Sequence, residues 1–298
     1  MPFESNDLRS TLPATKEVVP ERFSGAEHVQ FGDLSPMEKS DGVATWYARG
    51  QNFVAGYSDV DGSASWTREG QPDEYVVLLA DEGLSATADA SGDELTVSGK
   101  TMIVVPPGDS TVTVTGHGRV VRLLTTRSDD IAALAANAAS YAERHENIAP
   151  WQPWPDPVGG FKLRAYDLTV PPLSNPPFRL FRCTTFMVNF IDPKQGPRDP
   201  AKMSPHKHDD FEQCSIVLEG DYVHHIRWPW TTNKANWRPD EHQLVHAPSV
   251  TVIPPPSLHT SEAIAPGRNH LIDVFSPPRF DFSAMEGWVF NADEYPAP

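Results

Sequence analysis

Short segments in which apolar and polar residues alternate fill the chain between Val43 and Leu124. They include ATWYARG, NFVAGYS, EYVVLLA, ELTVSG and TMIVVPP, and Gly, Asp and Ser residues separate them. Such alternation is typical of strands with one buried face, because successive side chains of a strand point to opposite faces. The pattern predicts many short antiparallel strands in a sandwich or barrel.

The second half of the chain repeats this order with longer and more apolar segments. EYVVLLADEG in the first half corresponds to FEQCSIVLEG in the second, and VVPPGDST corresponds to VIPPPSLH. An internal repeat of about a hundred residues or more accounts for both matches. We therefore expect an all-β chain of two barrels, with FKLRAYDL and PFRLFRCTTFMVNFID as strands of the second.

A different pattern joins the two halves. Asp129 and Asp130 are placed to cap a helix that begins at Ile131 and ends near His145. Prolines and glycines then interrupt the segment NIAPWQPWPDPVGG, whose tryptophans offer packing surface. The predicted organisation is a first barrel over residues 1–127, a helical linker over 128–160 and a second barrel over 161–298.

Charge limits the partners of the chain. Its 298 residues carry a formal net charge of −16. Residues 1–150 hold 23 acidic and 11 basic side chains, and residues 151–298 hold 17 and 13. Nucleic acids and anionic membrane surfaces bind basic faces, so this balance argues against both. We expect a small-molecule substrate, and a monomer or homodimer.

Targeting signals and paired cysteines are missing from the sequence. No apolar run reaches the roughly 18–20 residues needed to cross a bilayer. Residues 1–40 are polar, lack the start of a secretory signal, and predict an arm that packs along a barrel or stays loose. Cys183 and Cys214 form no CxxC pair. Two reduced, buried thiols in a cytoplasmic protein are the expectation.

Histidines gather in the second half, where eight of the eleven lie beyond residue 205. His206 and His208 stand one residue apart, so on a strand both imidazoles point to one face. Such pairs commonly bind Zn, Fe, Ni, Cu or Mn, and the alternative is a pair of surface histidines beside a turn. An oxygen ligand follows at Glu212 or Gln213, and a third imidazole follows at His259.

This arrangement resembles the cupin family. The first cupin motif is a glycine, HxH, three or four residues, Glu, six residues and Gly; the second is P-x-G-x-x-H. PPPSLH, which ends at His259, fits the second motif with Pro256 where glycine is usual. HLIDVFSPPR looks like the last strand of many small cupins. The resemblance spans about residues 178–282 and implies a metal-binding barrel.

The resemblance also implies a ligand set for one divalent metal ion: His206, His208, Gln213 and His259. Six residues separate Gln213 from Gly220, the spacing at which most cupins carry glutamate. Glu212 is the alternative to Gln213, because a one-residue bulge would exchange the two faces. A neutral amide leaves the ion with more net positive charge, which favours polarising an anionic substrate. Fe²⁺ is favoured, and Ni²⁺, Zn²⁺ or Mn²⁺ suit the same donors.

The first half lacks these ligands. GSASWTREGQPDE, at the place of HxH, contains no histidine, and Thr111 stands where the second motif would put one. Only Glu74 occupies a ligand-like position. We predict a structural role for this half.

The segment DYVHHIRW, directly after Gly220, holds the candidates for substrate binding and catalysis: Arg227, His225, Tyr222 and Trp228. On a strand His225 and Arg227 share one face, and Tyr222 and His224 share the other. The glycine turn leaves open which face looks into the barrel.

Arg227 is our choice for the group that binds a carboxylate or enolate oxygen, because a guanidinium is a fixed bidentate donor. The alternative is a structural ion pair with Asp221 or Glu219. The tryptophan-rich insertion from Trp228 to His242 predicts a loop that gates the metal.

Cupins carry out dioxygenation, isomerisation, decarboxylation and lyase reactions, and the fold alone does not choose among them. We expect a metal-dependent enzyme that acts on a small oxygenated, anionic organic substrate. A dioxygenase-type oxidoreductase is favoured, because the aromatic insertion suggests a closed, partly apolar mouth. The alternatives are a sugar-acid isomerase or lyase, which the glutamine supports, and a non-catalytic ligand-binding cupin.

Overall fold

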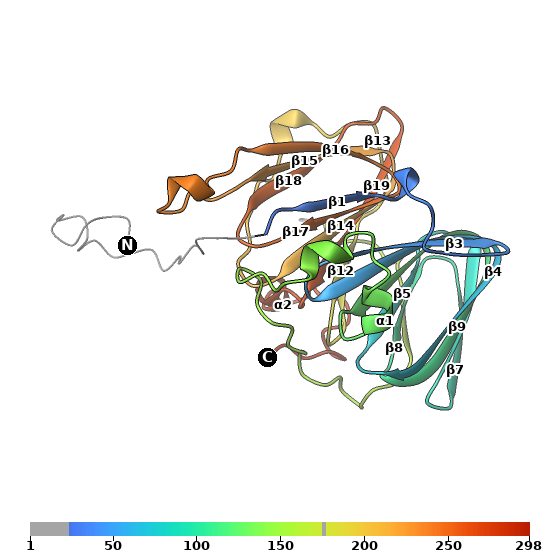
Figure 1. The fold of residues 1–298 in the computed structure, drawn as a ribbon. Helices are drawn as coiled ribbons and strands as arrows, with labels where there is room; N and C mark the ends of the chain where they lie inside the picture. The colour runs from blue at the N-terminus through green and yellow to red at the C-terminus, as the bar shows by residue number, and fades with distance from the viewer. Residues whose placement is uncertain (1–23, 175–176) are drawn as a thin grey trace.

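Two β-barrels pack against each other in the structure, a computed structural model that describes residues 24–174 and 177–298 (Figure 1). Strands dominate, and the two α-helices are single turns at Asp129–Ala132 (α1) and Phe280–Ser283 (α2). The predicted all-β class is confirmed. Most of the predicted N-terminal arm, residues 1–23, lies outside the described residues.

The first barrel is one sheet of nine strands: β2 (Glu38–Ser40), β3 (Val43–Arg49), β4 (Phe53–Gln71), β5 (Tyr75–Leu79), β6 (Leu84–Ala90), β7 (Asp93–Ser98), β8 (Thr101–Val105), β9 (Gly108–Thr125) and β10 (Arg164–Asp167). β4 and β9 are long and pair over nearly their whole length. Gly116 lies where β9 passes β6, and a Cβ there would collide with the carbonyl oxygen of Gly83.

The second barrel has a large sheet and a small one. The large sheet contains β1 (Glu27–Gln30), β11 (Leu180–Arg182), β12 (Met187–Phe190), β13 (Lys194–Gln195), β14 (Glu212–Glu219), β17 (Ser249–Ile253) and β19 (Arg268–Ser276). The small sheet contains β15 (Asp221–Arg227), β16 (Glu241–His246) and β18 (Leu258–Ala263). Single 3₁₀ turns lie at Phe31–Asp33, Ala138–Tyr141, Pro200–Lys202 and Lys234–Asn236.

Strand pairing repeats between the two barrels. β5 pairs with β8 and β9, and β14 pairs with β17 and β19. β6 pairs with β7 and β9, and β15 pairs with β16 and β18. Val76 on β5 therefore corresponds to Cys214 on β14, since each lies between the equivalent two partners. This order agrees with the predicted internal repeat.

Each half contributes one edge strand to the sheet of the other half. β1, from the start of the described chain, pairs with β17 of the second barrel. β10, which follows the linker, pairs with β8 of the first barrel. The two exchanges are equivalent, because β8 and β17 hold the same place in the repeated pairing order.

One apolar core joins the barrels. Val76, Leu78 and Val121 of the first barrel share it with Cys214 and Ile216 of the second. These side chains lie on the outer face of each barrel, and their burial explains why every residue of β5, and every residue of β14 before Glu219, is buried. A separate core fills the first barrel.

The linker does not form the predicted continuous helix. After α1 the backbone N–H of Ala136 bonds to the carbonyl oxygen of Tyr47, and the amide of Asn137 bonds to both backbone groups of Arg49. Pairing with the edge of β3 replaces helical hydrogen bonds, which overrides the helix preference of the alanines. The prediction of one helix from Ile131 to His145 was wrong.

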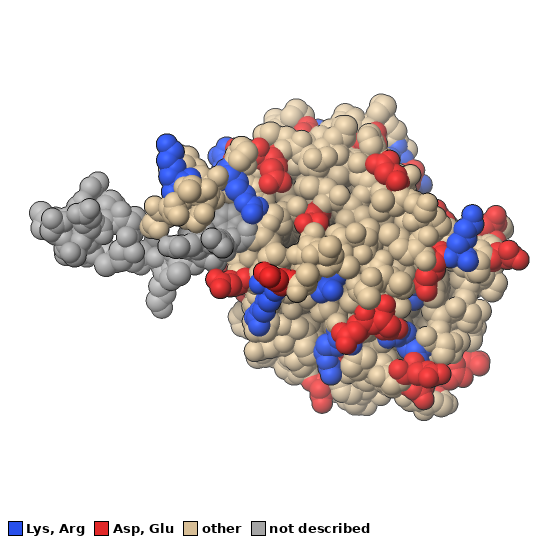
Figure 2. Space-filling view, in the orientation of Figure 1, with Lys and Arg blue, Asp and Glu red and all other residues tan. Residues whose placement is uncertain are grey.

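Charged side chains of both signs are scattered over the face shown in Figure 2, and the described basic residues form no continuous patch there. Within residues 24–174 and 177–298, no helix is long and apolar enough to span a membrane.

Candidate metal-binding site

Three of the predicted ligands come together in the second barrel. His206 and His259 face each other as an isolated β-bridge, with backbone N···O distances of 3.0 and 2.8 Å in the two directions. Their ring centroids lie 4.5 Å apart, and the ring of His208 lies 5.0 Å from that of His259. His208 and His259 are buried, whereas His206 is exposed.

Gln213, the fourth predicted ligand, lies beside them at the start of β14. Its Oε1 is 3.1 Å from Nε2 of His259. Its Nε2 donates to Oδ1 of Asp273 and to Oγ of Ser215, at 3.1 Å each, and Ser215 donates to the same Asp273 oxygen at 2.6 Å. Asp273 therefore fixes the orientation of the amide, with its oxygen toward His259.

The contacts of His259 leave one nitrogen facing the wrong kind of atom. Nδ1 lies 3.0 Å from the carbonyl oxygen of Ser257, and Nε2 faces the amide oxygen of Gln213. Burial lowers the pKa of His259 to about 3, so the ring is neutral and has a single N–H for two acceptors. A cation between Nε2 and the amide oxygen would remove this conflict.

The other two histidines also present free nitrogen atoms. Nδ1 of His206 lies 2.9 Å from the carbonyl oxygen of Ser204, which leaves its Nε2 available. Both ring nitrogens of His208 are buried without a hydrogen-bond partner, and the ring stacks on Phe211 with centroids 4.0 Å apart. Burial lowers the pKa of His208, which favours the neutral, ligating form.

These residues fit a divalent ion by the chemistry of their donors. In the described part of the chain, no three His, Cys, Asp or Glu side chains converge on one point. The rings of His206, His208 and His259 are neighbours that do not converge on one point, and the amide of Gln213 supplies an oxygen beside them. Three neutral imidazoles and one amide oxygen could hold Fe²⁺, Mn²⁺, Ni²⁺ or Zn²⁺.

Glu212, the alternative to Gln213, points to the opposite face of β14. Its carboxylate accepts hydrogen bonds from the backbone N–H groups of Gln51 and Asn52, at 2.8 and 2.9 Å, in the first half of the chain. Burial raises its pKa to about 7. The bulge that would have turned Glu212 toward His259 is absent here, because β14 pairs regularly with β19 from Glu212 to Val217.

β15, the strand after Gly220, turns Arg227 away from the barrel interior, whereas a substrate-binding role required Arg227 to point inward. Burial alternates along β15, and Arg227 and His225 lie on its outer face. Arg227 is exposed and pairs with Asp240 at 2.6 Å. His225 bonds to Glu262 and His242. Neither side chain reaches the cluster, so nothing in this arrangement supports the substrate-binding role predicted for Arg227 and His225.

Tyr222 and Trp228 are buried in packing contacts. Tyr222 lies in an apolar cluster with Val217 and Val245. Trp228, predicted as a substrate-binding residue at the start of a gating insertion, packs instead on Ile226 and Ile253. The rest of the insertion projects away from the barrel in Figure 1.

The sequence interpretation missed two residues beside the cluster. Asp273 lies on β19, which the sequence predicted only as the closing strand of the barrel. No sequence pattern indicated that Asp273 bonds to Gln213. Arg279 is buried, with its Cζ 5.0 Å from the centroid of Phe211, and it pairs with Asp281 at 2.6 Å. The sequence did not indicate where the side chain of Arg279 points, because the strand alternation cannot be extended through the preceding Ser-Pro-Pro turn.

The equivalent place in the first barrel holds other side chains. Tyr75 corresponds to Gln213, one residue before Val76, and its hydroxyl bonds to Ser110 at 3.0 Å. Arg122 corresponds to Asp273 and lies 4.4 Å from the ring centroid of Trp66. Ser110 rather than Thr111 faces inward, so the predicted position of a lost histidine was shifted by one residue.

Glu74 does not occupy a ligand position. Its carboxylate accepts from the backbone N–H and hydroxyl of Thr184 and from the hydroxyl of Tyr295. It corresponds to Glu212, whose carboxylate likewise bonds to a loop of the other half.

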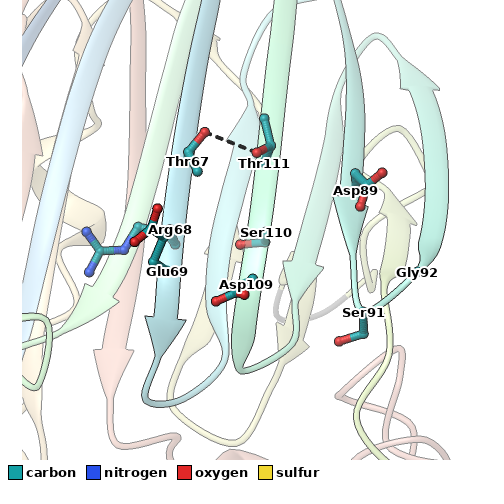
Figure 3. Close-up of a pocket in the computed structure, with 9 residues that line it drawn as sticks. All are labelled: Thr67, Arg68, Glu69, Asp89, Ser91, Gly92, Asp109, Ser110 and Thr111. Carbon is teal, nitrogen blue, oxygen red and sulfur yellow. Dashed lines mark hydrogen bonds between the residues drawn. The ribbon is translucent and has the colours of Figure 1, made fainter.

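A groove of 710 Å³ opens at the end of the first barrel (Figure 3). Its side chains include Arg68, Glu69, Asp89 and Asp109, and Arg68 is already paired with Asp130. No histidine lines it.

Neither a family model nor a curated protein matches this sequence. Solved structures do match. Vicilin from Corylus avellana has a TM-score of 0.54 at 10% identity and covers 84% of both chains. Oxalate decarboxylase from Lactobacillus farciminis, in a formate complex, has a TM-score of 0.53 at 12% identity and covers 85% of this chain and 86% of its own.

A third match is AerE from Microcystis aeruginosa, with a TM-score of 0.52 at 11% identity, covering 86% of this chain and 99% of its own. Identities this low carry the fold and not the activity. The structural neighbours are cupin proteins, and the pairing order shows the same barrel twice. The chain therefore has a fold of two cupin barrels.

Proposed function

We propose that the chain is a metal-dependent cupin enzyme with one divalent ion in its second barrel. The observation that carries the proposal is the single N–H of the neutral His259 ring, which faces two acceptors: the carbonyl oxygen of Ser257 at 3.0 Å and Oε1 of Gln213 at 3.1 Å. With the proton on Nδ1, Nε2 and Oε1 are both acceptors. Oriented acceptors in a buried site repel each other unless a cation lies between them. His206 and His208 complete the proposed ligand set.

The residues around the ligands support this role. Carbonyl oxygens of Ser204 and Ser257 hold the Nδ1 atoms of His206 and His259, which sets each Nε2 toward the ion. Asp273 holds the amide of Gln213 and places a carboxylate next to a neutral ligand set. A bound ion would supply positive charge that polarises substrate oxygens.

The proposed substrate is a small, oxygenated organic anion. Arg279 places a positive charge near His208, where it helps to keep the imidazole neutral. A negatively charged substrate would offset the charge of the ion. The oxalate decarboxylase that shares the fold was crystallised with formate, and another structure of such an enzyme is described with Mn(II) centres.

Dioxygenation with Fe²⁺ remains our proposed reaction class, and it rests on the neutral donor set. The predicted aromatic mouth no longer supports it, since Trp228 is part of the core and Trp230 is 72% exposed. A metal-dependent isomerase or lyase for sugar acids is the alternative, and the glutamine ligand favours it. A ligand-binding cupin without turnover is the third candidate.

Metal analysis of protein purified without chelators tests the proposal. We expect about one divalent ion per chain. Oxygen consumption with diketones, catechols and uronates then separates the reaction classes: uptake identifies a dioxygenase, and conversion without uptake identifies an isomerase or lyase. Protein that retains no metal under these conditions would refute the proposed function.

A further inference from the structure

Two more histidines face each other inside the second barrel. His28 comes from β1, the strand contributed by the first half, and His224 comes from β15 on the small sheet. Their ring centroids lie 6.1 Å apart. His224 is fully buried, and the side chain of His28 is 14% exposed.

Each ring is held at one nitrogen and free at the other. Nδ1 of His28 bonds to the hydroxyl of Thr251 at 3.1 Å, and Nδ1 of His224 bonds to the hydroxyl of Ser261 at 2.9 Å. Both Nε2 atoms are buried without a hydrogen-bond partner among the described residues. The carboxylate of Glu241 lies 3.8 Å from Nε2 of His28.

A buried polar group without a partner costs free energy, so two such nitrogens in one place are candidates to bind a further group. The hydroxyls fix the direction of both rings, so the free nitrogens are oriented and not randomly placed. Such a pair is suited to bind a polar atom of another molecule.

His28 and His224 lie close enough to the proposed metal ligands for one small molecule to contact both. His224 is paired with Ser261, which follows His259 by two residues on the same face of β18. Two residues along a strand span about 6.6–6.8 Å. A molecule that chelates the ion next to His259 could therefore reach His224 with its other end.

We propose that His28 and His224 bind a neutral oxygen, a hydroxyl or carbonyl, at the remote end of a short substrate whose carboxylate end chelates the metal. This inference rests on the proposed function. Burial lowers the pKa of both rings, so they offer neutral donors or acceptors. Glu241 beside His28 disfavours a second carboxylate at that end. The substrate class is thus a short hydroxy acid with a distal hydroxyl or carbonyl group.

Calorimetric titration of Zn²⁺-loaded protein tests the assignment with three probes: 2-hydroxybutyrate, 2,4-dihydroxybutyrate and malate. We expect about tenfold tighter binding of the dihydroxy acid than of 2-hydroxybutyrate, which corresponds to roughly one well-formed hydrogen bond. His224→Leu and His28→Leu should each remove that preference and leave the binding of 2-hydroxybutyrate unchanged. His225→Ala, on the outer face of the same strand, should keep it.

Equal binding of the two monocarboxylates by the wild-type protein, or a preference that survives both leucine variants, would overturn the inference. Tightest binding of malate would show an anionic remote end and overturn it as well. Chains that bind Zn²⁺ but none of the probes contradict this inference alone, whereas chains that bind no Zn²⁺ contradict the proposed function too.

Imidazole ¹⁵N resonances of the wild-type protein provide a second measurement that needs no folded variant. Addition of 2,4-dihydroxybutyrate should shift the Nε2 signals of His28 and His224 and leave that of the exposed His117 in place. Unchanged signals at saturation would refute direct contact.

Discussion

Glu212 and Gln213 are neighbours on β14 that point to opposite faces. Gln213 faces the imidazoles, and Glu212 faces the first half of the chain. The cupin motif, with six residues before Gly220, predicted this side for Gln213, and strand alternation puts its neighbour Glu212 on the other face. A Cβ on Gly220 would lie 2.7 Å from the carbonyl oxygen of Arg268, which explains why the turn that sets the count requires glycine.

His259→Ala should abolish stable metal binding without unfolding the protein. The substitution removes one proposed ligand, and loss of even a supporting partner commonly costs about 10–100-fold in affinity. Metal analysis and circular dichroism of the same sample measure the two effects. His225→Ala is the matched control, since His225 lies on the outer face of β15 and should keep full metal content. Full occupancy in the His259 variant would place the ion elsewhere.

Gln213 and Asp273 should behave as a coupled pair. Asp273→Asn removes the charge that orients the amide, and Gln213→Glu places two carboxylates at hydrogen-bond distance. We expect each single change to lower Zn²⁺ affinity about 10–100-fold, and the double exchange, which restores one amide and one carboxylate, to recover much of it. Competition with a chelator at fixed pH gives the four affinities. Purely additive losses would show that Asp273 does not act through Gln213.

At the scale of elements, the sequence predicted which residues face inward where a motif fixed their spacing, and it did not predict the inward face of strands that follow a turn. On β14 the motif spacing to Gly220 marked Gln213, although the strand is irregular between Val217 and Glu219. β15 begins after that turn, and the register that buries His224 and exposes Arg227 is set by its pairing with β18. The helix predicted for the linker was wrong for a related reason. The hydrogen bonds between Asn137 and Arg49 that replace it join residues far apart in the sequence.

Cutting the chain in the exposed Gly159–Gly160 turn tests the exchange of edge strands. Each fragment then lacks one strand of its own sheet, since residues 24–159 carry β1 and residues 160–298 carry β10. We expect each fragment to aggregate when expressed alone, because its unpaired edge is exposed, and the two to copurify as one complex when coexpressed. Size-exclusion chromatography separates these outcomes. Two soluble, monomeric fragments would mean that the exchange contributes little.

For the whole molecule, two buried carboxylates tie the halves together in a symmetrical way. Glu74 bonds to Thr184 in the loop between β11 and β12, and Glu212 bonds to Gln51 and Asn52 in the loop between β3 and β4. Both carboxylates lie beside the shared apolar core. The sequence could show that both residues exist, but their partners follow only from how the barrels pack.

Glu74 should make stability fall as pH rises. Burial raises its pKa above the ordinary value of 4.5, so the folded state holds its proton more tightly than the unfolded state does. The free energy of unfolding then decreases as pH rises from about 4.5, until the folded group also ionises. Glu74→Gln should remove this component from melting temperatures measured between pH 4 and pH 8.

Glu94→Gln is the control for that series, since Glu94 is exposed on β7 and its replacement should leave the slope unchanged. Parallel curves for the Glu74 variant and the wild-type protein, or a variant curve that falls more steeply, would contradict the assignment.

The reciprocal exchange of β1 and β10 also bears on ancestry. A single-barrel protein that dimerised by trading its first strand would place both copies in the relation seen here, around a two-fold axis. Fusion of the two copies end to end would then yield one chain in which each half still completes the other. In such a lineage only one copy needed to keep its histidines, and the other could acquire Tyr75 and Arg122 while still serving as the structural partner of the first.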